Sequence, residues 1–310
     1  MAITTDTVLT RAKYLTPIRF KKELVFGAAY DEAFKLCSDS QRYSERTIFK
    51  HGDPAVLPPE ALRWFKRKTI SGDILYLGHS FNLYGHFLLE TLPMIDYVMN
   101  DEFSGCKFLF LPWFRQKQRI LVNTLGLLGI DLNESKIVIH DGSITLIGSF
   151  FIVPRPIEIN HQLINAEPYR SVIDKLKKCP AVKACRDKTK VNNKIFLQID
   201  TKRTTPEYAS MVENIFSRLG FSLVRPEKLT LAEQIGLISE AEYIAGFSGS
   251  ALHNAIFAEA GAKVIQLDYN RSPLSAIRNQ EIITEITGVE HAYIPYQEAN
   301  LEAIAASLIP

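Results

Sequence analysis

The stretch from Lys194 to Tyr269 decides the fold, because short apolar runs alternate in it with segments of helical period. The successive elements read KIFLQID (194–200), PEYASMVENIFSRLG (206–220), FSLVRP (221–226), TLAEQIGLISEA (230–241), YIAGFS (243–248), SALHNAIFAEAG (250–261) and KVIQLDY (263–269). Strands joined by crossover helices form parallel sheets that are covered on both faces. We therefore predict a doubly wound α/β domain here.

The rest of the chain continues this theme less regularly. After Tyr269 we expect a helix, a strand and a last helix, at 276–288, 290–296 and 299–309. Before Lys194 we expect strands at 73–80, 107–112, 136–142 and 144–154, and helices at 82–100 and 114–129. These elements predict a second α/β unit. The first sixty residues show no clear pattern, and we expect them to cover an edge of its sheet.

This pattern divides the chain into an N-terminal α/β domain (1–165), a helix and linker (166–193) and a C-terminal α/β domain (194–310). The linker is assigned to residues 179–193, which are polar and lack an apolar period. Two sheet domains joined by a linker are expected to face a common cleft. Since open parallel sheets bind ligands beyond the carboxyl ends of their strands, we expect the chemistry at that place.

Composition excludes several classes of protein. The chain has 310 residues, of which 46% are hydrophobic and 23% charged, so it is a folded protein rather than a disordered one. Its net charge of +2 is too small to attract nucleic acid, and we expect no nucleic-acid partner. The four cysteines lack CxxC spacing and are expected to be thiols in a reducing compartment. No apolar run is long enough for a leader or a membrane span, which predicts a cytoplasmic protein.

The turn GFSGSALHN (246–254) is the first candidate for chemistry. Gly249 permits close approach of a ligand to the backbone, and the N–H groups of Ser250, Ala251 and Leu252 precede a predicted helix. Such amides bind anions, and a diphosphate is the natural ligand. In the alternative interpretation Ser248 is an N-cap and the glycines serve only the turn.

Other residues at the same sheet edge are candidates for ligand contacts. Asp268 ends a strand, a place from which a carboxylate accepts hydrogen bonds from ribose hydroxyls. Alternatively, it caps the next turn. The GxGxxG motif that accompanies such an acid in dinucleotide-binding proteins is missing. Lys202 and Arg203 follow the strand 194–200 and are suited to phosphate. Gln234 begins a helix and either contacts a base or sugar or is an ordinary surface residue. The basic segment 170–203 is otherwise interpreted as a solvated helix face and linker.

The predicted helix at 82–100 carries a titratable pair. His86 and Glu90 are four residues apart and therefore share a helix face. An imidazole with an adjacent carboxylate is suited to proton transfer, and either His86 or Glu90 could be the base. In the alternative interpretation the pair is only structural. His79 ends the preceding strand, and a metal site of His79, His86 and Glu90 is the weaker alternative.

Three segments together resemble the family 61 glycosyltransferases. NLYGHFLLETLP is similar to a family signature at Asn82, His86, Glu90 and Pro93. KIFLQIDTKR resembles a strand that ends in a basic turn, with Arg203 as the match. Residues 229–267 are similar to the family's last Rossmann-like stretch, with a His-Gly-Ala-Gly-Leu-Thr-Asn turn. This chain has Ser248 and His253 in place of the His and Thr of that turn and retains Asn254, so His253 is the candidate to contact the ligand instead.

The resemblance implies a GT-B architecture of two Rossmann-like domains and a metal-independent, inverting transfer from a nucleotide-diphosphate sugar, usually a uridine one. It implies no cofactor besides that substrate. The acceptor would be a hydroxyl of a glycan or of a lipid-linked saccharide, and the basic segment is suited to peripheral contact with anionic lipid. A sugar-nucleotide epimerase of the same architecture and a catalytically inactive homologue are the alternatives. The sequence does not indicate an oligomeric state.

Overall fold

The structure, a computed structural model, describes residues 9–20, 24–37, 40, 67–112, 118–132, 136–140, 145–157, 162–188, 193–199, 204–269 and 274–309. The chain forms two compact units, Met1–Pro168 and Tyr169–Pro310, each with its own sheet. The mixed α/β class expected from the sequence is confirmed. All four cysteines lie in the described ranges and carry thiols rather than disulfides, also as predicted.

The sheet of the second unit is parallel throughout. Its strands are β8 (Lys194–Leu197), β9 (Ser222–Val224), β10 (Tyr243–Phe247), β11 (Lys263–Leu267) and β12 (Glu290–Ile294). They lie in the order β12-β11-β10-β8-β9. Counted along the chain this is the order 2-1-3-4-5, one of the two common orders of doubly wound sheets. The parallel strands expected in residues 194–269 are confirmed.

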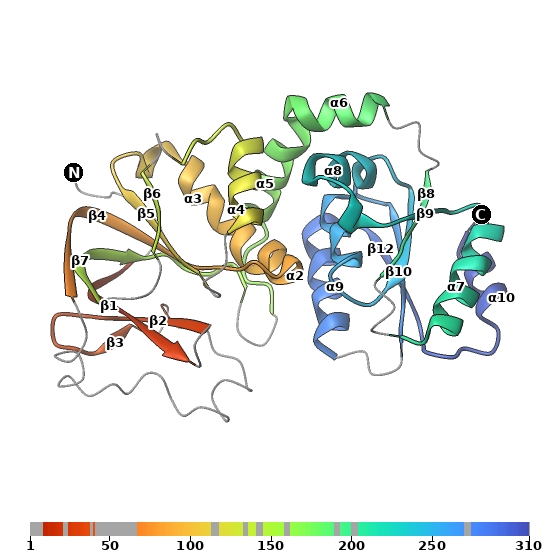
Figure 1. Cartoon of the computed structure of the whole chain (residues 1–310), viewed down its shortest axis with the longest axis horizontal. Helices are drawn as coiled ribbons and strands as arrows, with labels where there is room; N and C mark the ends of the chain where they lie inside the picture. Colours follow the sequence, from red (N-terminus) through yellow and green to blue (C-terminus); the bar gives the residue numbers. More distant parts are fainter. Residues whose placement is uncertain are drawn as a thin grey trace. The chain divides into compact units, whose positions relative to one another are not determined.

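Helices cover both faces of this sheet (Figure 1). The helices α7 (Pro206–Arg218) and α10 (Leu301–Ser307) lie on one face, and α8 (Leu231–Ser239) and α9 (Leu274–Thr287) on the other. Phe196, Phe247 and Leu267 of the strands pack with Val212 and Phe216 of α7 in a core that excludes water. Burial of this kind contributes about 1.5–3 kcal/mol for each large apolar side chain. The core therefore fixes the strand ends from which ligand-binding turns leave.

The first part of the segment interpreted as a linker, residues 180–188, is helical. Helix α5 (Glu167–Lys178) is followed directly by α6 (Pro180–Lys188), where a polar linker was expected. The lack of a clear apolar period misled that interpretation, because α6 buries only a narrow face. Val182 is fully buried, and Gly236 of α8 packs closely against α6. A Cβ at Gly236 would meet the Val182 carbonyl oxygen at 3.3 Å.

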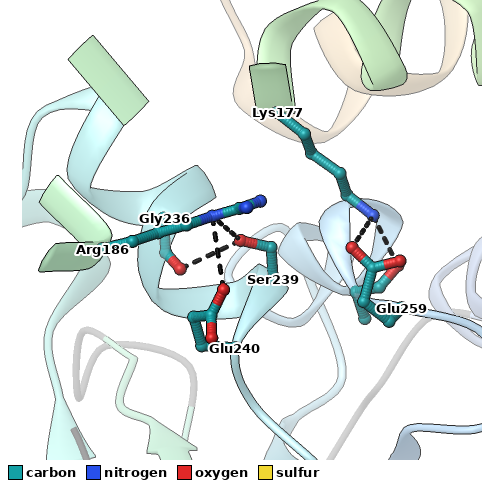
Figure 2. Close-up of polar contacts among 7 residues, drawn as sticks. Lys177, Arg186, Gly236, Ser239, Glu240 and Glu259 are labelled. Atoms are coloured by element: carbon teal, nitrogen blue, oxygen red, sulfur yellow. Dashed lines mark hydrogen bonds and ion pairs between the residues drawn. The ribbon is translucent and has the colours of Figure 1, made fainter. Parts of the chain in front are cut away.

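Three basic residues of α5 and α6 bond to the carboxyl ends of other helices, two of them shown in Figure 2. Arg186 donates to Ser239 at the end of α8 (2.9 Å). Lys177 donates to the carbonyl of Ala258 (3.0 Å), directly after the 3₁₀ helix η7 (Leu252–Phe257). Arg170 donates to the Ile286 carbonyl of α9 (3.0 Å). Cations stabilise helix carboxyl ends, so these residues belong to the second unit rather than to a solvated linker.

The sheet of the first unit is mixed, in the order β3-β2-β1-β7-β4-β5-β6. Its parallel part consists of β4 (Arg67–Ser80), β5 (Lys107–Pro112), β6 (Ile137–Ile139) and β7 (Thr145–Ile152). The strands β1 (Thr10–Phe20), β2 (Leu24–Tyr30) and β3 (Leu36–Cys37) continue the same sheet in antiparallel pairing. The N-terminal residues that are described thus extend the sheet itself at the side where we expected a cover. Helix α4 (Arg119–Leu127) connects β5 and β6.

Candidate active site

The titratable pair of the first unit follows the carboxyl end of β4, a buried strand from Ile74 onward. Three buried hydrogen bonds hold the loop after the strand. The Thr91 hydroxyl accepts the Phe81 N–H (3.0 Å) and donates to the His79 carbonyl (3.1 Å). Ser80 donates to Gln118 at the start of α4 (2.7 Å). Buried polar groups are costly unless they are paired, and here they are paired with each other, which makes the loop rigid.

The helix that carries the pair is irregular. It begins as α2 (Tyr84–His86), widens to a π-helix (η3, Phe87–Thr91), tightens to a 3₁₀ turn (η4, Leu92–Met94) and ends as α3 (Ile95–Met99). Pro93 has no N–H and cannot continue an α-helix, which accounts for the change of winding at this point. Helicity over 82–100 is confirmed in outline, but the π segment was not expected. Single π-turns are frequent at functional sites.

His86 and Glu90 lie on one side of this helix and contact each other, as predicted. The distance between His86 Nδ1 and Glu90 Oε1 is 2.7 Å. The His86 side chain is 40% exposed and that of Glu90 16%, so the imidazole is the more accessible of the two. A carboxylate only accepts hydrogen bonds, so Nδ1 is the donor and the lone pair of the neutral imidazole is on Nε2.

The surroundings of the pair are aromatic and apolar. The Phe81 ring lies 5.5 Å from that of His86, centroid to centroid, and Leu83 is 48% exposed beside it. Burial raises the pKa of Tyr84, so its phenol is neutral at physiological pH. His79 is buried, and its ring lies 6.1 Å from that of Phe81, centroid to centroid, in a tilted arrangement. Within the described ranges, no three His, Cys, Asp or Glu side chains are arranged to hold a metal ion, which gives the alternative metal site no support.

The second unit places its candidate turn at a topological switch point. In the order 2-1-3-4-5 the connections leave in opposite directions from β8 and β10, and ligands of such sheets bind beyond the carboxyl ends of those two strands. The turn 248–252 directly follows β10. Lys202 and Arg203, which follow β8 in the sequence, lie outside the described residues and stay predictions.

The helix after the turn 248–252 differs from the predicted one. Residues 250–261 were predicted as a helix, but only Leu252–Phe257 are helical, as the short 3₁₀ helix η7. All six residues of η7 are buried, so no solvated face stabilises a longer amphipathic helix. Gly249 has φ +141°, a conformation that favours glycine. Among the described hydrogen bonds, none is donated by the N–H groups of Ser250, Ala251 or Leu252, whereas those of His253 and Asn254 bond within the turn.

Several predicted ligand contacts are engaged inside the unit. The Ser248 hydroxyl is fully buried and donates to the Leu267 carbonyl (3.1 Å). His253 and Asn254 are buried, and the Asn254 amide donates to Ala251 (3.0 Å). The Asp268 carboxylate accepts from the Tyr269 N–H and the Tyr293 hydroxyl, both at 2.7 Å, which is the capping role of the alternative interpretation. Gln234 donates to the Leu229 carbonyl (3.1 Å).

The order of these segments along the chain agrees with a known family. The family model described as Glycosyltransferase 61 matches residues 84–265, more than half of the chain. The chain belongs to glycosyltransferase family 61. A comparison with curated proteins gives no significant match. The protein is therefore a glycosyltransferase, which in general uses a sugar donor and a glycan acceptor.

The match includes most of the candidate residues of the transferase. His86 and Glu90 lie near its start, and Gln234 and the turn 248–252 near its end, whereas Asn82 and Asp268 lie outside it. Asn82 lies in the half-buried loop before α2. In the described part of the transferase no helix has the length and apolar character needed to cross a membrane.

Sequence reasoning missed three residues near the sites of this transferase. Arg155 follows β7, and its Nη2 would lie 3.6 Å from a Cβ at Gly78, which has φ +82°. The rule that selected Lys202 and Arg203, a basic residue just after a strand, would have found it. Gln266 and His291 contact each other at 2.8 Å and support Ser248. No sequence signal marks them, because their partners come from different strands.

Proposed function

We propose that this glycosyltransferase moves a sugar from a uridine diphosphate donor to a hydroxyl of a glycan or of a polysaccharide precursor, with inversion at the anomeric carbon. The observation that carries the proposal is the 2.7 Å contact of His86 with Glu90 inside the segment that matches the family. Such a pair supplies the base that a direct displacement needs.

In this proposal His86 is the base and Glu90 is its positioning residue. Glu90 accepts the Nδ1–H of His86 and so leaves the lone pair on Nε2 of a side chain that is 40% exposed, and this nitrogen takes the proton of the acceptor hydroxyl. The hydroxyl oxygen attacks the anomeric carbon while its proton passes to Nε2. The bond from that carbon to the diphosphate breaks with its electron pair, and the single displacement inverts the configuration.

The departing diphosphate needs positive charge, and we assign this role to the turn 248–252 with Lys202 and Arg203. The N–H groups of Ser250, Ala251 and Leu252 are the amide donors of the turn, and fixed amides stabilise charge that develops in a transition state. With two basic side chains they replace a metal ion, so the reaction is metal-independent and needs no cofactor. Ser248 serves this turn through its buried hydrogen bonds rather than through the ligand.

The remaining parts of the proposal rest on the family resemblance. We propose the GT-B architecture of two Rossmann-like domains, and a cytoplasmic enzyme that extends a soluble or lipid-linked precursor. Contact with an anionic membrane surface would use the exposed lysines Lys175, Lys178 and Lys183, because Arg170, Lys177 and Arg186 are engaged internally.

The test is incubation of the purified full chain with UDP-sugars, with and without candidate saccharide acceptors and with EDTA. We expect UDP release and an inverted glycosidic linkage only with an acceptor, at a rate that EDTA leaves unchanged. A new sugar epimer without an acceptor would support the epimerase instead. A thermal-shift screen of nucleotides selects the donor, since a ligand at 100 times its Kd stabilises the fold by about 2.7 kcal/mol.

A further inference from the structure

Ser248 is bonded to the neighbouring strand through both its backbone and its side chain. Its N–H donates to the Leu267 carbonyl of β11 (2.8 Å), and its hydroxyl donates to the same oxygen (3.1 Å). The residue is fully buried. The first residue of the turn 248–252 is therefore fixed to β11, and the backbone of Gly249 to Leu252 starts from that point.

Gln266 is the second member of this buried arrangement. It lies in β11 opposite Gly246 of β10 and is fully buried. Its amide nitrogen donates to the Ser248 hydroxyl (2.9 Å), and its amide oxygen lies 2.8 Å from His291 Nε2 in β12. A primary amide inside a sheet is costly unless both of its ends are paired. Here both are paired, and three adjacent strands are joined.

The orientation of the Gln266 amide in the structure sets the direction of the hydrogen bonds in this polar chain of side chains. An amide oxygen only accepts, so His291 Nε2 must carry the proton and donate. Ser248 accepts from Gln266 and for that reason turns its own hydrogen to Leu267. Burial lowers the pKa of His291, although the charge of Glu281 on α9 opposes this, and the lowered pKa favours the neutral imidazole. Without that donor the Gln266 amide could rotate and offer its oxygen to Ser248.

We propose that His291 is a positioning residue for donor binding: through Gln266 it orients Ser248 and thereby the amides of the turn 248–252. This inference rests on the proposed function, because it takes that turn as the diphosphate site. His291 itself lies on the edge strand and acts on the donor only through Gln266 and Ser248.

The test compares two substitutions at one position in the full chain. His291→Leu removes the donor, whereas a glutamine in His291→Gln carries an amide N–H near the place of Nε2. We expect His291→Leu to raise the Kd for UDP and the KM for the donor about fivefold to tenfold, the factor that corresponds to one buried hydrogen bond, with kcat and the acceptor KM nearly unchanged. We expect His291→Gln to restore the donor KM to within about twofold of the wild type.

Val212→Ala is the matched control for a loss of stability. Val212 is fully buried in the core on the other face of the same sheet, so its truncation lowers Tm without touching the polar chain. An equal rise of donor KM in Val212→Ala and His291→Leu would overturn the positioning role, as would a wild-type donor KM in His291→Leu. Absence of UDP binding by the wild-type chain would overturn the proposed function and the positioning role with it.

A spectroscopic measurement tests the polar chain without any ligand. In ¹⁵N-histidine NMR spectra we expect His291 of the free protein as the neutral Nε2–H tautomer at pH 7. Gln266→Leu should change the His291 signals, because it removes the acceptor. Observation of the Nδ1–H tautomer in the wild type would contradict the assigned direction and overturn the proposal.

Discussion

The loop after β4 and the turn after β10 both leave the carboxyl end of a buried parallel strand, but they present opposite kinds of groups. At the first, the His86 side chain is 40% exposed, and the polar bonds that hold the loop lie beneath it. At the second, Ser248, His253 and Asn254 are buried, and the backbone is what remains for a ligand. The chemistry should depend on side-chain identity in the first unit and on backbone conformation in the second.

The largest effect should follow from removing the imidazole. His86→Ala is expected to lower kcat by about 10²–10⁴, the usual contribution of a general base, with little change in Tm because the side chain is partly exposed. Glu90→Ala should lower kcat less, because Glu90 only orients the base. The control is Met211→Ala, at an exposed position of α7 in the other unit. A larger loss in Glu90→Ala than in His86→Ala would reverse the two roles.

The second effect tests the backbone side of the comparison. Gly249→Ala introduces a side chain at φ +141° and is expected to cost about 1–3 kcal/mol of unfolding free energy and to raise the donor KM. The control is Gly261→Ala. Gly261 also has a positive φ, +85°, and nothing lies within 4 Å of a Cβ built there, but it precedes the amino end of β11, whereas the turn 248–252 follows the carboxyl end of β10. Denaturant unfolding should show a loss of unfolding free energy in both variants. Donor kinetics should show a raised donor KM only in Gly249→Ala. Equal KM values would refute the assignment of the turn.

A third and smaller effect concerns the opposite edge of the second unit. Arg186→Ala removes the bond to the nearly buried Ser239 and should reduce the unfolding free energy by about 1 kcal/mol, without altering the donor KM. Arg218→Ala serves as the control, since its bonds to Glu302 are exposed and should not contribute measurably. If Arg186→Ala weakened donor binding, the α5–α6 segment would have a role beyond packing.

The smallest effect is expected at alkaline pH. Burial raises the pKa of Tyr97 and of Tyr293 from 10.0 to about 12. In Tyr293 the hydrogen bond to Asp268 adds to this effect. Because the folded state holds these protons more tightly, their stabilisation is complete below pH 10 and is lost as the pH rises toward 12. Tyr97→Phe and Tyr293→Phe should each make the fall of Tm over this range less steep, by more at the more buried Tyr97. An unchanged slope in both variants would contradict the shifts.

The sequence predicted this protein best where structure is local. Most strands and helices between Lys194 and Tyr269 lie where the apolar runs and helical periods placed them, and the segment 250–261 is the exception. The contact of His86 with Glu90 also followed from spacing alone, because residues four apart are neighbours on any helix. Each of these features depends on residues only a few positions apart.

Tertiary packing decided the rest. The π segment around Glu90, the 3₁₀ winding of η7 and the helix α6 depend on what surrounds them, and local propensity is too weak to predict such choices. The chain from Ser248 through Gln266 to His291 joins residues 18 and 25 positions apart. Only the pairing of β10, β11 and β12 brings these side chains within hydrogen-bonding distance. Because they are shielded from water there, each polar group requires a hydrogen-bond partner within the protein.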